Sequence, residues 1–219
     1  MTDIVGNETL IFEYTYSEFD QDVNRIANVF LSLNIKKGDH VALQLHSSPE
    51  FLMCLFGLSK IGAIVVPVNE QYLSDEAEYI LRTSGAVCAV TEPLFFETYE
   101  ELLQRGLYFP KGLLVARAGS DSPESEIDFS QFYTKPGEEK EGVQSIYNFW
   151  EMRCEESTEL REYVELNSMD PCQIIYTSGT TSKPKGVVVT HANMVFSGLY
   201  GDWEVSLRRS DRVLSSMPA

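Results

Sequence analysis

The amino-acid sequence predicts an α/β protein in which mainly parallel sheets are flanked by helices. Short runs of β-branched residues alternate with segments whose apolar residues recur at helical spacing, from residue 17 to residue 116. One run, residues 64–68, is apolar throughout, which is typical of a central strand covered on both faces. With 219 residues, of which 43% are hydrophobic and 11% aromatic, the chain can build a core of that kind.

The first helices and strands follow from local signals. Ser17 is predicted to cap a helix, because an apolar stripe at helical spacing runs from Val23 to Leu33 behind it. Ser48-Pro49-Glu50 is predicted to open a second helix, with Pro49 suited to its first turn, and Gly62 is predicted to close it. The predicted order is a helix over 17–33, a strand over 40–45, a helix between 48 and 62, and a strand over 64–68.

The alternation continues beyond residue 70. Ser74 is predicted to cap a helix with an acidic first turn, and Gly85 is predicted to end it. The following elements are a strand over 86–91, a helix over 95–104 and a strand over 113–116. This spacing of strands and helices favours βαβ units.

The composition then changes in a way that divides the chain. Residues 117–142 are rich in Gly, Ser, Asp, Glu and Pro without an apolar period, which is typical of a solvent-exposed connector. A short helix is expected over 146–154. We therefore predict an N-terminal α/β subdomain over 1–116, an acidic connector with a short helix over 117–165, and the start of a second subdomain over 166–219.

Residues 177–186 carry the strongest chemical signal. They read Thr-Ser-Gly-Thr-Thr-Ser-Lys-Pro-Lys-Gly, which combines small side chains, hydroxyl donors, backbone N–H groups and positive charge. A bound polyphosphate requires those groups. Residues 173–176 and 187–189 read as strands, so a strand–loop–strand hairpin is predicted, with a helix over 192–207 and a strand over 212–215 behind it. The Gly-Lys-Ser/Thr of a Walker loop and the closely spaced glycines of a dinucleotide loop are missing. On the residues alone, an ordinary surface hairpin remains an alternative.

The same loop resembles a known signature. The order Thr-Ser-Gly-Thr-Thr-x-x-Pro-Lys-Gly-Val, followed by Thr190 and His191, is similar to that of the adenylate-forming (AMP-binding) superfamily, which includes the acyl-CoA synthetases. Ser182 stands where most members carry glycine, and crotonobetaine/carnitine–CoA ligases resemble this chain in having serine there. Residues 34–43 and 56–69 also resemble those ligases. The resemblance implies the N-terminal part of the large domain of such an enzyme, continuing beyond Ala219.

The resemblance also implies a reaction and a set of site residues. The reaction is ATP-dependent activation of a small carboxylate, such as carnitine or crotonobetaine, followed by transfer to CoA, with Mg²⁺ as the metal. The ATP-phosphate site maps to Thr177, Ser178, Gly179, Thr180, Thr181 and Lys185. Thr181 and Lys185 are the candidate catalytic residues, whereas the side chain of Lys183 is expected to be solvated. The ligand for Mg²⁺ and the acyl pocket are expected beyond residue 219, so residues 1–219 alone are not expected to make acyl-CoA.

Two alternatives to this function stay open. One is an adenylation domain that loads an amino acid on a carrier protein, and the other is a non-catalytic nucleotide-binding module of the same fold. Among the histidines, His191 is expected to bond nearby backbone at the start of a helix. His40 and His46 belong to no acid–base constellation that spacing alone can identify.

Composition excludes some partners and locations. A net charge of -16 argues against binding nucleic acid, which needs a basic face. No secretory signal or apolar run long enough to span a bilayer is visible at or after Met1. The four cysteines are far apart in sequence, which predicts reduced, mostly buried thiols in a cytoplasmic protein. Whether the protein forms a homo-oligomer is left open.

Overall fold

The computed structural model describes residues 2–5, 8–11, 13–116, 133–135, 137–177, 183–206, 208 and 211. Seven strands form one sheet in the order β7-β6-β5-β3-β4-β8-β9, and β1 (Thr2–Val5) pairs separately with β2 (Glu8–Ile11). Neighbours in the large sheet are parallel, except that β8 and β9 are antiparallel. The predicted α/β class with a mainly parallel sheet is confirmed. The divisions at 1–116, 117–165 and 166–219 stay predictions.

Helices and strands alternate through the body of the molecule. In chain order they are α1 (Tyr16–Ser32), β3 (His40–Leu43), α2 (Pro49–Lys60), β4 (Ile64–Pro67), α3 (Ser74–Ser84), β5 (Cys88–Thr91), α4 (Pro93–Gln104), β6 (Leu113–Val115), β7 (Ile146–Asn148), α5 (Phe149–Glu155), β8 (Pro171–Thr177), β9 (Lys185–Thr190) and α6 (His191–Val205). A helix between successive parallel strands returns the chain to the amino edge of the sheet, so the carboxyl ends of β3, β4 and β5 share one edge.

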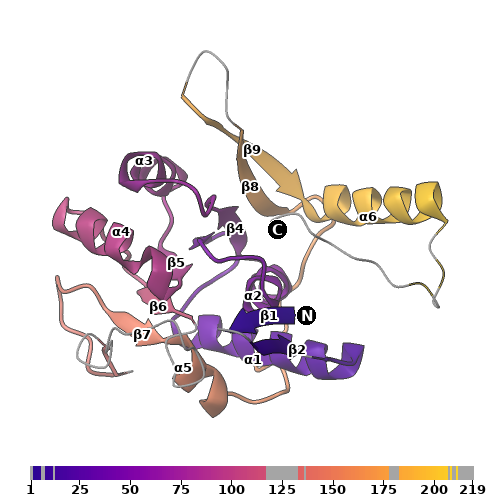
Figure 1. Ribbon diagram of the computed structural model, residues 1–219, viewed down its shortest axis with the longest axis horizontal. Helices are drawn as coiled ribbons and strands as arrows, with labels where there is room; N and C mark the ends of the chain where they lie inside the picture. Colours follow the sequence, from indigo (N-terminus) through magenta and orange to yellow (C-terminus); the bar gives the residue numbers. More distant parts are fainter. Residues whose placement is uncertain are drawn as a thin grey trace.

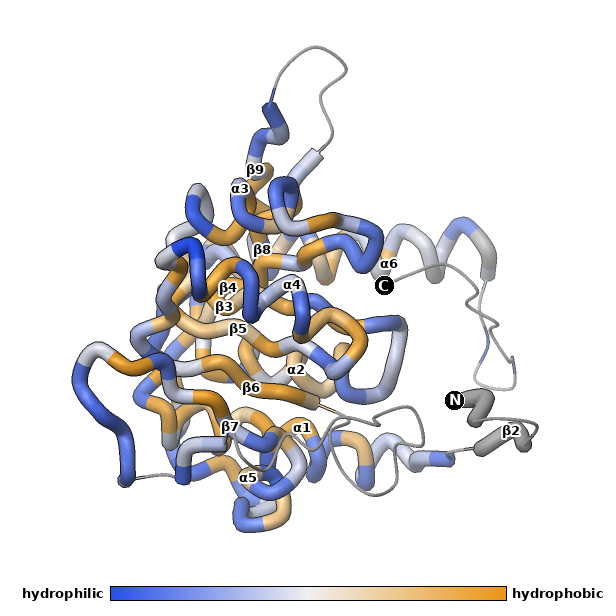
Figure 2. The backbone as a smooth tube through the Cα atoms, turned by 60° about the vertical axis from the view of Figure 1, so that its left-hand side comes forward, coloured by the Kyte–Doolittle hydropathy of each residue, from blue (hydrophilic) through white to orange (hydrophobic). Residues whose placement is uncertain are grey.

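The sheet separates two hydrophobic cores, because successive side chains of a strand point to opposite faces. Val41 and Leu43 of β3 pack in the core covered by α1, α2 and α5, whereas Ala42 packs in the core covered by α3 and α4 (Figure 1). Strands β3 to β6 are mainly hydrophobic along their length (Figure 2). Both faces of these strands are therefore buried, as a parallel sheet requires.

Both predicted helix caps, Ser17 and Ser74, need correction. The N-cap of α1 is Thr15, not Ser17: its hydroxyl accepts from the backbone N–H of Glu18 at 3.2 Å, and the Glu18 carboxylate accepts from the Thr15 N–H at 2.8 Å. The predicted start of α2 at Ser48 is confirmed: Ser48 is its N-cap, and the Ser48 hydroxyl accepts from the backbone N–H of Phe51. At α3 the N-cap is Leu73, and the hydroxyl of Ser74 contacts the carboxylate of Glu101 instead.

The region after residue 116 differs from its prediction in one element. The expected helix over 146–154 is a strand, β7, followed by the shorter helix α5, because residues 146–148 pair with β6. Residues 137–145 contain no helix or strand, whereas 117–132 and the strand predicted over 212–215 lie outside the described residues. The cysteines are all unpaired, and three of the four are buried: Cys54, Cys88 and Cys172.

Helix α6 extends away from the body of the molecule (Figures 1 and 2). Its start is fixed by two hydrogen bonds. The backbone N–H of His191 donates to the carbonyl of Asp170 at 3.1 Å, and the hydroxyl of Thr190 accepts from the backbone N–H of Asn193 at 3.2 Å. Farther along, Phe196 is 72% exposed and Trp203 is 80% exposed. Among the residues of α6 whose exposure the structure describes, packing is therefore concentrated in the first turn.

Candidate functional site

The predicted strand–loop–strand hairpin is present. Strands β8 and β9 pair antiparallel, with Tyr176 opposite Gly186 and Thr177 opposite Lys185 as the last pair before the loop. Residues 178–182 lie outside the described residues, so the placement of Ser178, Gly179, Thr180 and Thr181 stays a prediction, as does that of Ser182. The structure thus places two of the six predicted phosphate contacts, Thr177 and Lys185, side by side at the mouth of the loop.

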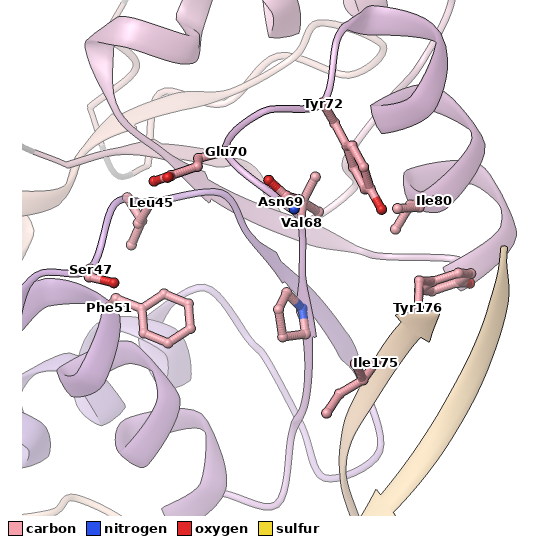
Figure 3. Close-up of a pocket in the computed structure, with 11 residues that line it drawn as sticks. Leu45, Ser47, Phe51, Val68, Asn69, Glu70, Tyr72, Ile80, Ile175 and Tyr176 are labelled. Atoms are coloured by element: carbon pink, nitrogen blue, oxygen red, sulfur yellow. The ribbon is translucent and has the colours of Figure 1, made fainter. Parts of the chain in front are cut away.

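The position of the hairpin in the sheet favours ligand binding. Because β8 is parallel to β4, Thr177 ends β8 at the same edge as the carboxyl ends of β3 and β4. Open α/β sheets bind ligands outside that edge. A hollow of about 190 Å³ lies there, lined by residues that include Phe51 of α2, Asn69 and Glu70 after β4, and Ile175 and Tyr176 of β8 (Figure 3).

The two loop lysines have different surroundings. Lys185 is exposed, and no ion pair that involves it is found in the part of the chain that the structure describes. The charge of Lys185 is therefore available to an anionic ligand. The ammonium of Lys183 instead lies 5.3 Å from the centre of the Tyr79 ring of α3, a cation–π arrangement. Lys183 is exposed, as expected, but its side chain is directed to α3.

A cluster of one histidine and two glutamates, which the sequence spacing did not predict, lies near this edge. His46, after β3, contacts the carboxylate of Glu92, after β5, through Nδ1, and its Nε2 lies 3.6 Å from the carboxylate of Glu70, after β4. The ring also stacks on Phe95, with centroids 5.1 Å apart. Burial raises the pKa of Glu92, and His46 opposes that rise. Within the described residues, no group of three or more His, Cys, Asp or Glu is arranged to hold a metal ion.

The other two histidines lie outside this cluster: the ring of His40 binds backbone, and His191 begins α6. His40 Nδ1 donates to the carbonyl of Ser84 at 2.5 Å, which ties the start of β3 to the end of α3. His191 is the first residue of α6, as expected, but its contact to nearby backbone is made by its own N–H and not by its ring. Its ring Nε2 is buried without a partner among the described residues. We assign no role in phosphate binding to either histidine.

A buried carboxylate in the first turn of α2 gives a pH prediction. Glu50 is only 7% exposed, and its Oε2 has no hydrogen-bond partner among the described residues. Burial raises the pKa of this carboxyl above its usual value, aided by the nearby Glu92 and opposed by Ser48 and Arg153. A raised carboxyl pKa means that the folded state holds its proton longer than the unfolded state does, so stability falls as pH rises through the folded pKa. We expect Glu50→Gln to raise the free energy of unfolding at pH 7.5 by on the order of 1 kcal/mol and to flatten its fall between pH 4.5 and 7.5.

Urea denaturation at both pH values measures this difference. The matched control is Glu76→Gln, which changes an exposed carboxylate in the first turn of α3. It should leave both stability and its pH dependence within about 0.5 kcal/mol of the wild type. Equal pH profiles for Glu50→Gln and the wild type would show that Glu50 titrates alike in the folded and unfolded chains.

The fold and the hairpin agree with the comparisons to known proteins. The family model of the AMP-binding enzymes matches residues 6–219, so the chain belongs to the AMP-binding enzyme family. A crotonobetaine/carnitine–CoA ligase of Salmonella agona is 37% identical over 212 residues, which are 97% of this chain and 37% of that protein. The ligase of the same name from Salmonella paratyphi A is 36% identical over 228 residues, covering 100% of this chain and 40% of the relative.

Solved structures show the same fold. An anthranilate CoA ligase in complex with anthranoyl-AMP superposes with a TM-score of 0.69 at 26% identity, covering 90% of this chain and 34% of that one. An acyl-CoA synthetase of Brucella canis gives a TM-score of 0.70 at 25% identity, covering 92% of this chain and 32% of that one. The chain thus spans well under half the length of the curated relatives that it matches. No helix among the described residues is long and apolar enough to cross a membrane.

Proposed function

We propose that the natural protein containing this chain is an AMP-forming acyl-CoA synthetase and that the β8–β9 hairpin holds the phosphates of ATP. The observation that carries the proposal is the pairing of Thr177 with Lys185, which forms no ion pair with the described residues, at the mouth of the loop. The hairpin adjoins the carboxyl edge of the parallel strands, where α/β proteins bind ligands. Membership in the AMP-binding enzyme family supports the same nucleotide.

Each loop residue has a role in this proposal. The hydroxyls of Thr177, Ser178, Thr180 and Thr181 donate to phosphate oxygens, and Gly179 lets the backbone approach closely. Lys185 supplies the fixed positive charge, and Thr181 and Lys185 act on the transition state. In a chain with a net charge of -16, local cations of this kind are needed to offset the long-range repulsion of ATP.

The reaction has two steps. A carboxylate oxygen of the substrate attacks the α-phosphorus of ATP and the bond to the β-phosphate breaks, which gives an acyl-adenylate and pyrophosphate. The sulfur of CoA, having lost its proton, then attacks the acyl carbon and AMP leaves, which gives the thioester. Both the attack and the departure of pyrophosphate place negative charge on phosphate oxygens, which the hairpin and Mg²⁺ would stabilise.

The substrate class is a finer proposal. Two relatives named crotonobetaine/carnitine–CoA ligase, at 36–37% identity, support a small betaine carboxylate. Ser182 in the loop agrees with that assignment, since those ligases resemble this chain in having serine there. Because the chain has four unpaired cysteines, we also propose a reducing, cytoplasmic location.

A substrate panel on the full-length natural protein tests both levels. We expect pyrophosphate release in the presence of ATP and Mg²⁺ to depend on the added acid and to be fastest with carnitine, crotonobetaine or γ-butyrobetaine, and CoA to convert the product to a thioester. Preference for short fatty acids would overturn the betaine assignment but keep the ligase. Release with amino acids, and no thioester to CoA, would favour an adenylation domain, and no turnover with any acid would favour a nucleotide-binding module.

A further inference from the structure

Strands β8 and β9 extend beyond the rest of the sheet and are stabilised by contacts to the body of the protein. Strand β9 is the last strand of the sheet among the described residues, so one of its edges has no strand partner there. Val187 and Val188 are 49% and 55% exposed. The two strands rise past α3 before they reach the loop (Figures 1 and 2). An isolated two-stranded ribbon is marginally stable in water, so contacts to the body of the protein contribute to the stability of these two strands.

Helix α3 supplies contacts to both ends of that loop. The hydroxyl of Tyr79 donates to the carbonyl of Pro184, which follows the loop, at 3.1 Å. Thr83 Oγ1 lies 3.1 Å from the hydroxyl of Tyr176, which precedes the loop. Since Thr83 already donates to the Tyr79 carbonyl at 2.5 Å, the Tyr176 hydroxyl is the donor in this bond. Tyr79 and Thr83 are four residues apart and thus occupy one face of α3.

Gly186 makes room for the Tyr176 side of this arrangement. A Cβ atom at residue 186 would lie 2.8 Å from Cγ2 of Ile174 and 3.4 Å from Cζ of Tyr176. The backbone of Gly186 has no positive φ, so free space and not conformational freedom is what the glycine supplies. The ring of Tyr176 therefore lies over its cross-strand partner, where its hydroxyl reaches Thr83.

We propose that Tyr79 and Thr83 of α3 are positioning residues for the phosphate-binding hairpin. They fix the residues on either side of the loop, while Lys183 rests on the Tyr79 ring and leaves Lys185 as the charge directed to the ligand. Groups held in place before the reaction need no reorganisation when charge develops on the phosphates, which is why positioning affects rate. This inference rests on the proposed function of the hairpin.

The test uses the full-length natural protein with Tyr79→Phe, Thr83→Val and the double variant. Tyr79→Phe keeps the ring under Lys183 and removes only the bond to Pro184. We expect each single variant to lower kcat/KM for ATP by about 3- to 10-fold and the double variant by more, with KM for the acid nearly unchanged. Hydrogen exchange of the backbone amides in β8 and β9 should accelerate in the same order. The control is Tyr108→Phe, at a half-exposed tyrosine outside the hairpin and α3, which should change neither.

The two readouts separate the possible failures. Faster exchange with unchanged kcat/KM for ATP in an active enzyme would overturn the positioning role, because the contacts would then be only structural. Unchanged hydrogen exchange and unchanged kinetics would show that the hydrogen bonds of Tyr79 and Thr83 do not stabilise the hairpin, and the proposal would be wrong. Absence of acid-dependent turnover in the wild type would overturn the proposed function, and the exchange arm would still decide whether α3 orders the hairpin. A larger loss in KM for the acid than for ATP would also contradict the proposal.

Discussion

Replacing Lys185 with alanine is expected to lower acid-dependent formation of AMP and pyrophosphate by about 100-fold in the full-length protein. Lys185 is paired with Thr177 at the mouth of the loop and is not engaged by a carboxylate of the described residues. Removing one preorganised group that meets developing negative charge typically lowers kcat by a factor of about 100 to 1,000. Steady-state release of pyrophosphate at saturating acid, with ATP varied, measures the loss. The change should appear mainly in kcat, because the interaction strengthens in the transition state.

Lys183→Ala is the matched control for this prediction. It removes the same charge two residues away, where the ammonium lies over the ring of Tyr79. An exposed cation–π contact contributes about 0.5–1 kcal/mol, so a loss of no more than about fivefold is expected. Equal losses for the two lysines would show that the loop uses diffuse charge, and the assignment of Lys185 as the catalytic lysine would then be wrong.

The class of the fold could be predicted because it depends on local patterns. The apolar run at 64–68 and the glycine at 85 correspond to β4 and to the left-handed end of α3, with φ +66°. Helix starts were harder, because several residues of the right type compete. Thr15 and Ser17 both qualify as caps of α1, and Glu18, three residues after Thr15, is the feature that decides between them.

Elements that depend on distant partners could not be predicted in the same way. β7 has three residues and is defined by its pairing with β6. In that pairing Ile146 lies opposite Leu113, which is 33 positions earlier in the sequence. Three residues are too few for a period to be visible in the sequence.

The same distinction between local and distant partners applies to the residues of the candidate site. The hairpin and Lys185 belong to one contiguous segment, so the sequence could indicate both. His46, Glu70 and Glu92 meet only because β3 lies between β4 and β5 in the sheet. Predicting that cluster requires the strand order, which no local pattern contains. The support that α3 gives the hairpin likewise joins Tyr79 to Pro184 across 105 positions.

Asn28→Ala is expected to lower the free energy of unfolding by about 3 kcal/mol. Asn28 of α1 is fully buried, and its amide group holds the segment that leaves α5. Its Nδ2 donates to the carbonyls of Ser157 and Glu159 at 3.0 and 2.8 Å, and its Oδ1 accepts from the N–H of Arg161 at 2.9 Å. Alanine would leave three backbone groups without these partners, each at about 1 kcal/mol or more when buried. Urea denaturation followed by circular dichroism measures the loss.

Asn24→Ala provides the comparison within the same helix. One turn earlier, Asn24 is half-buried and donates a single bond to this segment, to the carbonyl of Thr158 at 2.9 Å. It also accepts from the ammonium of Lys60 at 2.7 Å, which water can replace. We therefore expect a loss of about 1 kcal/mol. A loss at Asn28 no larger than that at Asn24 would mean that water reaches the freed carbonyls of Ser157 and Glu159, and the segment would then be held mainly by its apolar contacts and not by the amide of Asn28.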